Sequence, residues 1–248
     1  MPTPIANNVL ASLPRKVYQD VLPLFAPVAL EFGELLYAEG ERMKEVYFPQ
    51  TCVVSLMVVV DHDAALEVAL VGRDGLVGVP LALGAELSPV RALVQGAGTA
   101  LRITRLRFRA ALDEHAPLRE AVYHYAGSLM GQVGQTAACN RFHQVNARLA
   151  RWLLMTRDRL GSAEFRVTQE FLSAMLGVRR VGVSEAASSF QDQHLIEYSR
   201  GVITILDHPG LETACCSCYE VDVARAGGMA KWRPPSAGPA DLALTPAS

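Results

Sequence analysis

Short apolar runs separated by glycine-containing turns fill the first hundred residues of the chain. The runs are 31–37, 45–48, 52–60, 65–71 and 93–103. Turn signals such as Gly72-Arg-Asp-Gly75 stand between them. Strands of this length, with a turn every dozen residues or so, are typical of β-sandwiches and barrels. We therefore expect a β-sheet unit from about Leu10 to Ile103, with a short helix over Leu13–Leu24 ahead of it.

A helical pattern replaces the strand pattern after Ile103, first over Arg105–His115 and then from Pro117, which suits the first turn of a helix. Apolar residues then recur with spacings of 4, 3, 4 and 4, which describes one face of a helix. They are Leu118, Val122, Tyr125, Leu129 and Val133. This face suits packing against the chain's own β-unit. Glycines in the same helix also permit close approach by a second copy, and the periodicity favours neither interpretation.

The third part of the chain has the pattern of a winged helix-turn-helix. A helical stripe over Val145–Leu160 ends at Gly161, and Thr168 is a suitable N-cap for a second helix that ends at Gly177. A third helix is expected from Arg179 to about Gln191, followed by a hairpin that turns at Arg200-Gly201. Helix, short turn, helix and hairpin in this order define the motif.

Composition narrows the class of protein. The chain has 248 residues, of which 50% are hydrophobic and 19% charged, which is enough apolar material for a packed core. No apolar run approaches the roughly 20 residues of a membrane span, and residues 1–11 lack the pattern of a secretory signal. We expect a cytoplasmic protein with no membrane partner. A net charge of −2 argues against non-specific coating of nucleic acid, but it allows a sequence-specific DNA binder.

The segment Thr168–Ile196 resembles the helix-turn-helix of the Crp/Fnr transcription regulators. The glycine-rich front half is similar to their cyclic-nucleotide-binding β-roll, and the helix from Pro117 to their dimerisation helix. Together these similarities span roughly Leu13–Leu206. Cys139-Asn-Arg141 and Leu206–Glu212 resemble one branch of the family. The resemblance implies a homodimeric regulator that reads a palindromic site in double-stranded DNA, with RNA polymerase as a candidate partner.

The expected fold is α+β, with an N-terminal, jelly-roll-like β-roll as sensor, a long dimerisation helix and a C-terminal winged helix-turn-helix. The expected boundaries are a flexible N-terminus at 1–10, the roll at 11–110, the dimerisation helix at 111–139, the DNA-binding domain at 140–226 and a disordered tail at 227–248.

The resemblance also implies which residues contact DNA. Arg180 matches the arginine that reads guanine, whose fork can donate two hydrogen bonds to O6 and N7. The other candidates for base or phosphate contact are Thr168, Gln169, Arg179, Gly182, Ser184 and Arg200. Many family members have a glutamate directly after the guanine-reading arginine, whereas this chain has Val181 and then Gly182. We therefore expect this chain to prefer a DNA sequence that differs from the best-known consensus site of the family.

The expected effector pocket departs further from the family pattern. Its candidate residues are Gly78, Val79, Ser88 and Arg91. Val79 stands where the family has the glutamate that holds the ribose, and Ser88 and Arg91 lack the order of the pair that grips the cyclic phosphate. A buried phosphate needs such a charged partner. We expect that cAMP does not bind, and the effector is left open as an apolar ligand, another nucleotide or none.

Cys215, Cys216 and Cys218 are dense enough to suggest a metal site or thiol switch. A fourth ligand would have to be Cys139, Cys52 or His208. We predict structural thiols and no metal, with a redox or metal sensor on the same fold as the alternative. A haem ligand at His62, in a polar turn, is not expected.

Sequence motifs of catalysis are not found in the chain, so no enzyme and no catalytic residue is predicted. A further alternative is a module whose winged helix contacts protein rather than DNA, which the balanced charge of the C-terminal half would suit.

Overall fold

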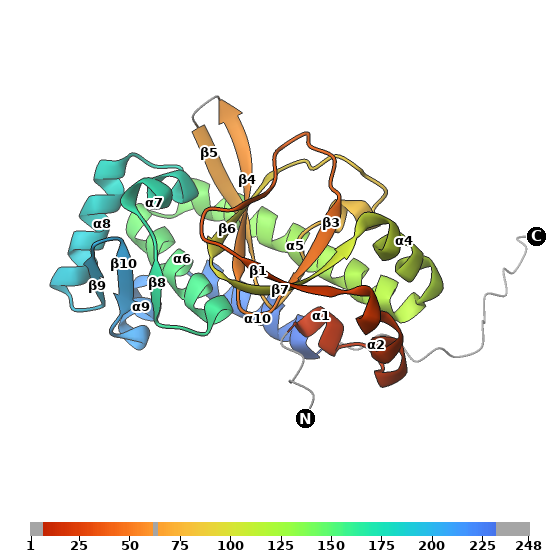
Figure 1. Ribbon diagram of the computed structural model, residues 1–248. Coiled ribbons are helices and arrows are strands. Elements are labelled where there is room, and N and C mark those ends of the chain that lie inside the picture. The colour runs from red at the N-terminus through yellow and green to blue at the C-terminus, as the bar shows by residue number, and fades with distance from the viewer. Residues whose placement is uncertain (1–6, 62–63, 232–248) are drawn as a thin grey trace, which may run out of the picture.

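The computed structural model describes residues 7–61 and 64–231 (Figure 1). Two antiparallel sheets form a roll, in the strand orders β1-β7-β3 and β2-β6-β4-β5. Its strands are β1 (Ala26–Leu30), β2 (Leu35–Tyr37), β3 (Glu45–Pro49), β4 (Val53–Asp61), β5 (Ala64–Val71), β6 (Arg91–Gly96) and β7 (Gly98–Thr104). The roll, the long helix that follows it and the winged unit confirm the expected α+β fold.

Two strands of the roll differ from the sequence prediction. The single run expected over 93–103 is divided between β6 and β7, which belong to different sheets. The chain crosses at Gly98, where a Cβ would lie 2.7 Å from the backbone nitrogen of Cys52. Strand β1 was not predicted because Pro27 weakens its strand pattern. Proline is tolerated there because β1 is an edge strand.

The first described residues, from Asn7 onward, are anchored to the roll. The helices of this N-terminal segment are α1 (Asn8–Ala11), α2 (Arg15–Val21) and the 3-10 turn η1 (Leu22–Leu24). A further short helix, α3 (Val79–Ala82), follows β5 within the roll. Asn7 is fully buried, and its Nδ2 donates to the carbonyl oxygens of Pro49 (2.9 Å) and Gly75 (2.8 Å). The prediction of a flexible segment over 1–10 is therefore wrong for residues 7–10. Residues 1–6 lie outside the described part of the chain.

Helix α4 (Arg105–Glu114) leads into the long α5 (Ala116–Phe142), which runs along the roll (Figure 1). Leu118, Val122 and Tyr125 are buried in the core of the roll and Leu129 packs against it, so this part of the predicted apolar stripe faces the chain's own strands, whereas Val133 is exposed. A neighbouring face of α5 is exposed and contains Tyr123 and Met130.

The winged unit contains α6 (Val145–Leu160), β8 (Glu164–Arg166), α7 (Gln169–Leu176), α8 (Arg180–Asp192), β9 (Ile196–Ser199) and β10 (Val202–Ile205). The predicted helix ends at Gly161 and Gly177 are observed, and both glycines adopt positive φ. Arg179 is the N-cap of α8 rather than its first residue. Strand β8 was not predicted, because it has only three residues and forms through pairing with the distant β10.

Two further helices, α9 (His208–Ala214) and α10 (Cys218–Lys231), follow the wing. Helix α10 returns to pack on α5 and α6. Residues 227–231 belong to this helix, so the predicted disordered tail does not begin at 227. The packing of α10 against two other helices explains the difference. Residues 232–248 and His62 lie outside the described part of the chain. Among the described helices, none is long and apolar enough to cross a membrane.

The roll and the winged unit share their packing. One core lies between the sheets and α5. The second surrounds α6, α7 and α8, and it includes Val53, Met57 and Leu70 from β4 and β5. The β4–β5 hairpin therefore contributes side chains to both cores.

Candidate nucleic-acid interface and effector pocket

Local capping fixes the two helices of the helix-turn-helix. Thr168 caps α7, and its Oγ1 accepts a hydrogen bond from the backbone nitrogen of Phe171 at 3.1 Å. Gly177 ends the helix with a φ of +60°, a conformation that glycine adopts without a steric penalty. Leu172 of α7 and Val183 of α8 are buried, whereas Thr168 at the start of α7 and Arg180 and Val181 of α8 are exposed.

The exposed face of α8 carries most of the predicted DNA-binding residues. Arg179 and Arg180 are exposed at its N-terminal end, and Ser184 follows one turn later on the same face. Gln169, in the first turn of α7, lies with its Nε2 3.4 Å from the Ser184 Oγ. The structure therefore brings the start of α7 and the first two turns of α8 to one surface. A Cβ at Gly182 would meet only open space.

The wing adds a second group of cations. Arg200 and Gly201 form the β9–β10 turn with φ values of 51° and 76°, the pattern of a type I′ hairpin turn. Arg200 is exposed at its tip. Arg166 on β8, opposite Val202 in register, is exposed as well, and the sequence analysis missed it. If the sequence analysis had predicted a third strand beside the hairpin, Arg166 would have been placed on the wing.

Carboxylates limit the positive charge of this surface. Glu185 and Asp192 are exposed on α8, beside a shallow hollow that Val181 and Ser184 also line. The surface is therefore mixed in charge, and its affinity for a polyanion depends on where the arginines stand rather than on a net positive field.

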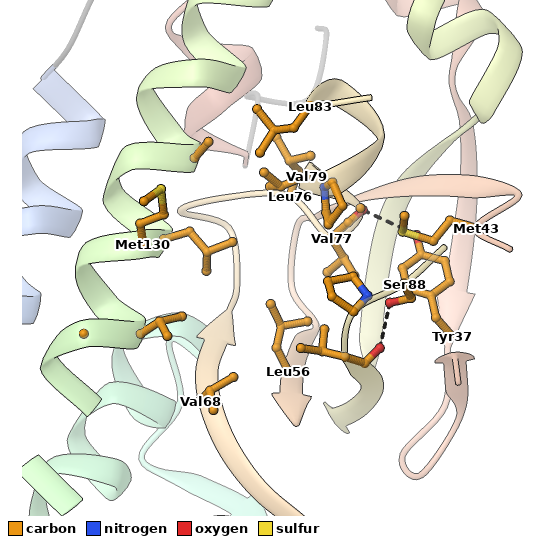
Figure 2. Close-up of a pocket in the computed structure, with 18 residues that line it drawn as sticks. Tyr37, Met43, Leu56, Val68, Leu76, Val77, Val79, Leu83, Ser88 and Met130 are labelled. Carbon is orange, nitrogen blue, oxygen red and sulfur yellow. Dashed lines mark hydrogen bonds between the residues drawn. The ribbon is translucent and has the colours of Figure 1, made fainter. Parts of the chain in front are cut away.

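A pocket of about 490 Å³ lies between the roll and α5 (Figure 2). Apolar side chains line it, from Leu56 and Val68 on the sheet to Met130 on α5. Of the expected effector residues, Gly78, Val79 and Ser88 line it, whereas Arg91 is not among its lining residues. The lining was incompletely predicted because α5 contributes to it only through the tertiary fold.

The pocket offers few free polar groups. The Ser88 Oγ donates to the carbonyl oxygen of Val90 at 2.6 Å, as Figure 2 shows. The Tyr37 hydroxyl donates to the carbonyl oxygen of Glu45, and burial raises the pKa of this tyrosine. Among the described residues that line the pocket, none carries a charge.

A buried carboxyl group lies where the roll meets the winged unit. Glu67 on β5 accepts a hydrogen bond from the Trp152 Nε1 of α6 at 3.0 Å. Burial raises the pKa of Glu67 to about 7, against the opposing effects of Ser55, Trp152 and the positively charged Arg159. Because the carboxyl group joins two units, its protonation is coupled to their packing.

We predict that this group makes stability depend on pH. Between about pH 4.5 and 7 the folded chain holds a proton at Glu67 that the unfolded chain has released, so the free energy of unfolding falls as pH rises through this window. The Glu67→Gln variant should lack this decrease and exceed the wild type at pH 8 by about 3 kcal/mol. Urea unfolding at pH 5, 6, 7 and 8 measures the effect. The exposed Glu197→Gln variant is the control, and a wild-type profile shared by Glu67→Gln would contradict the prediction.

The C-terminal unit has a recognised sequence pattern. Residues 147–214 match the model of the Crp-like helix-turn-helix domain. They form a Crp-like helix-turn-helix domain. The Crp-like domain includes α7, α8 and the wing, so the resemblance to the Crp/Fnr regulators is confirmed there by residues as well as by fold. No curated protein sequence matches the chain significantly.

Solved structures of similar fold align with three quarters or more of this chain. FixK2 from Bradyrhizobium japonicum is 14% identical, with a TM-score of 0.66 over 78% of this chain and 98% of its own. The c-di-GMP-responsive regulator CLP from Xanthomonas campestris is 16% identical, with a TM-score of 0.63 over 78% of this chain and all of its own. A CRP-family transcriptional regulator from Thermus thermophilus is 19% identical, with a TM-score of 0.62 over 75% of this chain and 95% of its own. The chain therefore has the Crp/Fnr fold.

Proposed function

We propose that this chain is a transcription regulator that binds a palindromic DNA site as a homodimer and reads it with α8. The observation that carries the proposal is the pair of exposed arginines, Arg179 and Arg180, at the start of the second helix of a Crp-like helix-turn-helix domain. In helix-turn-helix proteins the N-terminal residues of this helix contact base edges in the major groove. Arg180 is assigned to guanine.

The neighbouring residues have distinct roles in this proposal. The backbone amides at the start of α7, beside Thr168 and Gln169, face a phosphate. Ser184 contacts a base or a phosphate one turn after Arg180, and the open space at Gly182 admits a base edge or methyl group. Arg179 and Arg200 bind the DNA backbone.

The exposed face of α5 supports a dimer. Tyr123, Gly127, Met130 and Gly134 are all exposed, and they follow one another at spacings of 4, 3 and 4, which is the repeat of a two-helix seam. A Cβ at Gly127 or Gly134 would meet open space, so a second helix can approach closely. A two-fold pair would place two copies of α8 in successive major grooves, about 34 Å apart. RNA polymerase is then a partner at the bound promoter.

The test is selection of binding sites from a random DNA library by the full chain, together with its mass in solution by light scattering. We expect palindromic sites, a dimer, and an affinity that falls steeply with salt because phosphate contacts release counterions. A monomer that enriches no sequence at low salt, with or without reductant, would overturn the proposal.

We propose that the pocket binds an apolar effector rather than a cyclic nucleotide. A buried cyclic phosphate requires a charged or multi-donor partner, and apolar side chains occupy the corresponding wall. Met130 and Gly134 line the pocket and also belong to the exposed seam of α5. An occupant would therefore contact the helix proposed to hold the dimer together.

A charge placed in the pocket should prevent apolar binding. We predict that Val79→Glu lowers the affinity for an apolar dye such as Nile red at least tenfold, because the probe would have to desolvate a carboxylate. Val60→Glu adds the same charge at an exposed position and is the control. Dye fluorescence gives the affinity, and cAMP is added to the wild type in a thermal-shift assay. A stabilisation by cAMP would contradict the proposal of an apolar effector.

A further inference from the structure

Four metal-ligating side chains from distant parts of the sequence meet at the C-terminal end of α5. Cys139 lies in the last turn of this helix, and His143 is its C-cap, four residues later. Cys216 lies in the connection between α9 and α10, and Cys218 is the first residue of α10. The packing of α10 against α5 brings the two pairs together.

The distances within this cluster suit one tetrahedral ion. The Sγ atoms of Cys139 and Cys216 are 3.6 Å apart, and the Cys218 Sγ is 3.5 Å from the His143 Nδ1. All four ligand atoms lie within 4.8 Å of one another. Zinc binds thiolate sulfur at about 2.3 Å and histidine nitrogen at about 2.0–2.1 Å, so tetrahedral geometry separates two sulfurs by about 3.8 Å and sulfur from nitrogen by about 3.5 Å.

We propose that Cys139, His143, Cys216 and Cys218 bind a single zinc ion. Three cysteines and one histidine form a closed set of the kind that structural zinc sites use. Binding of Zn²⁺ releases the thiol protons to solvent, with no change in oxidation state. The site joins the end of the long helix to the α9–α10 connection, across the turn where α5 gives way to α6.

Polar groups around the cluster fit this assignment. Three thiolates and one divalent ion leave a net charge of −1, and the buried guanidinium of Arg151 lies beside Cys139 and favours that charge. The Gln135 Nε2 donates a hydrogen bond to the Cys218 Sγ at 3.0 Å. Such outer contacts orient metal ligands and tune their affinity.

The other two cysteines lie outside the set and supply controls. The Cys215 Sγ is 3.8 Å from the carbonyl oxygen of Ala147, although Cys215 directly precedes a ligand in sequence. Cys52 is fully buried in the core of the roll. The sequence analysis predicted structural thiols and no metal, and its candidates for a fourth ligand were Cys139, Cys52 and His208 but not His143.

The experiment measures metal bound to the full chain purified with reductant and without chelator. We expect about one zinc per chain by mass spectrometry of the elements. Cys216→Ser and Cys218→Ser should lower zinc affinity at least tenfold in competition with a chromophoric chelator, whereas Cys215→Ser should retain the wild-type affinity. Circular dichroism confirms that each variant is folded.

A second measurement uses the wild type alone, so that it does not depend on the folding of a variant. Replacement of zinc by Co²⁺ should give the sulfur-to-cobalt charge-transfer band and the intense visible bands of a tetrahedral thiolate site. Of the five cysteines, only the partly exposed Cys215 should then react with a thiol reagent in the folded chain, because Cys52 is fully buried. Several results would overturn the proposal: no metal after reconstitution with Zn²⁺, equal affinities for Cys216→Ser and Cys215→Ser, bound iron with cluster absorbance, or a Cys139–Cys216 disulfide in the reduced preparation. DNA is absent from these assays, so their failure is separate from failure of the proposed regulator.

Discussion

Replacement of Arg180 by alanine should abolish sequence-specific DNA binding and leave the fold intact. The side chain is exposed, so its loss opens no cavity in the core. A bidentate contact to guanine contributes about 1–3 kcal/mol of discrimination, and a dimer makes it twice. The expected loss of about 2–6 kcal/mol corresponds to a decrease in affinity of roughly 30-fold to 10⁴-fold. Fluorescence anisotropy on the selected palindrome, at two salt concentrations, measures it.

Two control variants separate base reading from simple loss of charge. Arg107→Ala removes the same charge from an exposed position of α4, far from the Crp-like domain, and should bind like the wild type. Arg180→Lys keeps the charge but loses the planar fork, so it should retain binding to random DNA and lose preference for the palindrome. Equal effects of Arg180→Ala and Arg107→Ala would show that α8 does not read the bases.

Much of the Crp-like domain could be predicted from the sequence because local signals define it. Thr168, Gly161 and Gly177 fix the ends of helices through backbone conformation and capping, which depend on neighbouring residues alone. The turn at Arg200-Gly201 is similarly local. The elements that were missed depend on distant partners: β8 needs β10, and α10 needs the surfaces of α5 and α6.

Residues of the candidate sites could likewise be predicted where local signals place them, but not where tertiary packing brings them together. The arginines of α8 could be placed from the helix-turn-helix pattern, whereas Met130 joins the pocket only when α5 packs against the roll. The four proposed zinc ligands also come together only through long-range packing. Cys139 and His143, spaced by four residues at the end of an expected helix, were the local signal that could have indicated half of it.

Breaking the ion pair between Arg151 on α6 and Asp222 on α10 should be strongly destabilising. The Arg151 Nε is 2.7 Å from the Asp222 Oδ2, and the two side chains are 7% and 4% exposed. Asp222→Asn removes the carboxylate that contacts the guanidinium directly, and the charge of the proposed zinc site beside Cys139 does not replace this 2.7 Å contact. Loss of one partner from a buried pair typically costs about 3–5 kcal/mol. Guanidinium-chloride unfolding, in the presence of excess zinc for every variant, measures the change.

A double substitution tests whether the pair itself stabilises the fold or only satisfies two buried charges. Arg151→Met with Asp222→Leu removes both charges at similar volume, and such replacements are often neutral or stabilising. We therefore expect the double variant to recover most of the free energy lost in Asp222→Asn. The exposed pair between Arg42 and Glu86 is the control, because Arg42→Gln should change the free energy of unfolding by less than about 1 kcal/mol. An Asp222→Asn effect no larger than this would mean that water reaches the pair and that α10 is held to α6 mainly by its apolar contacts.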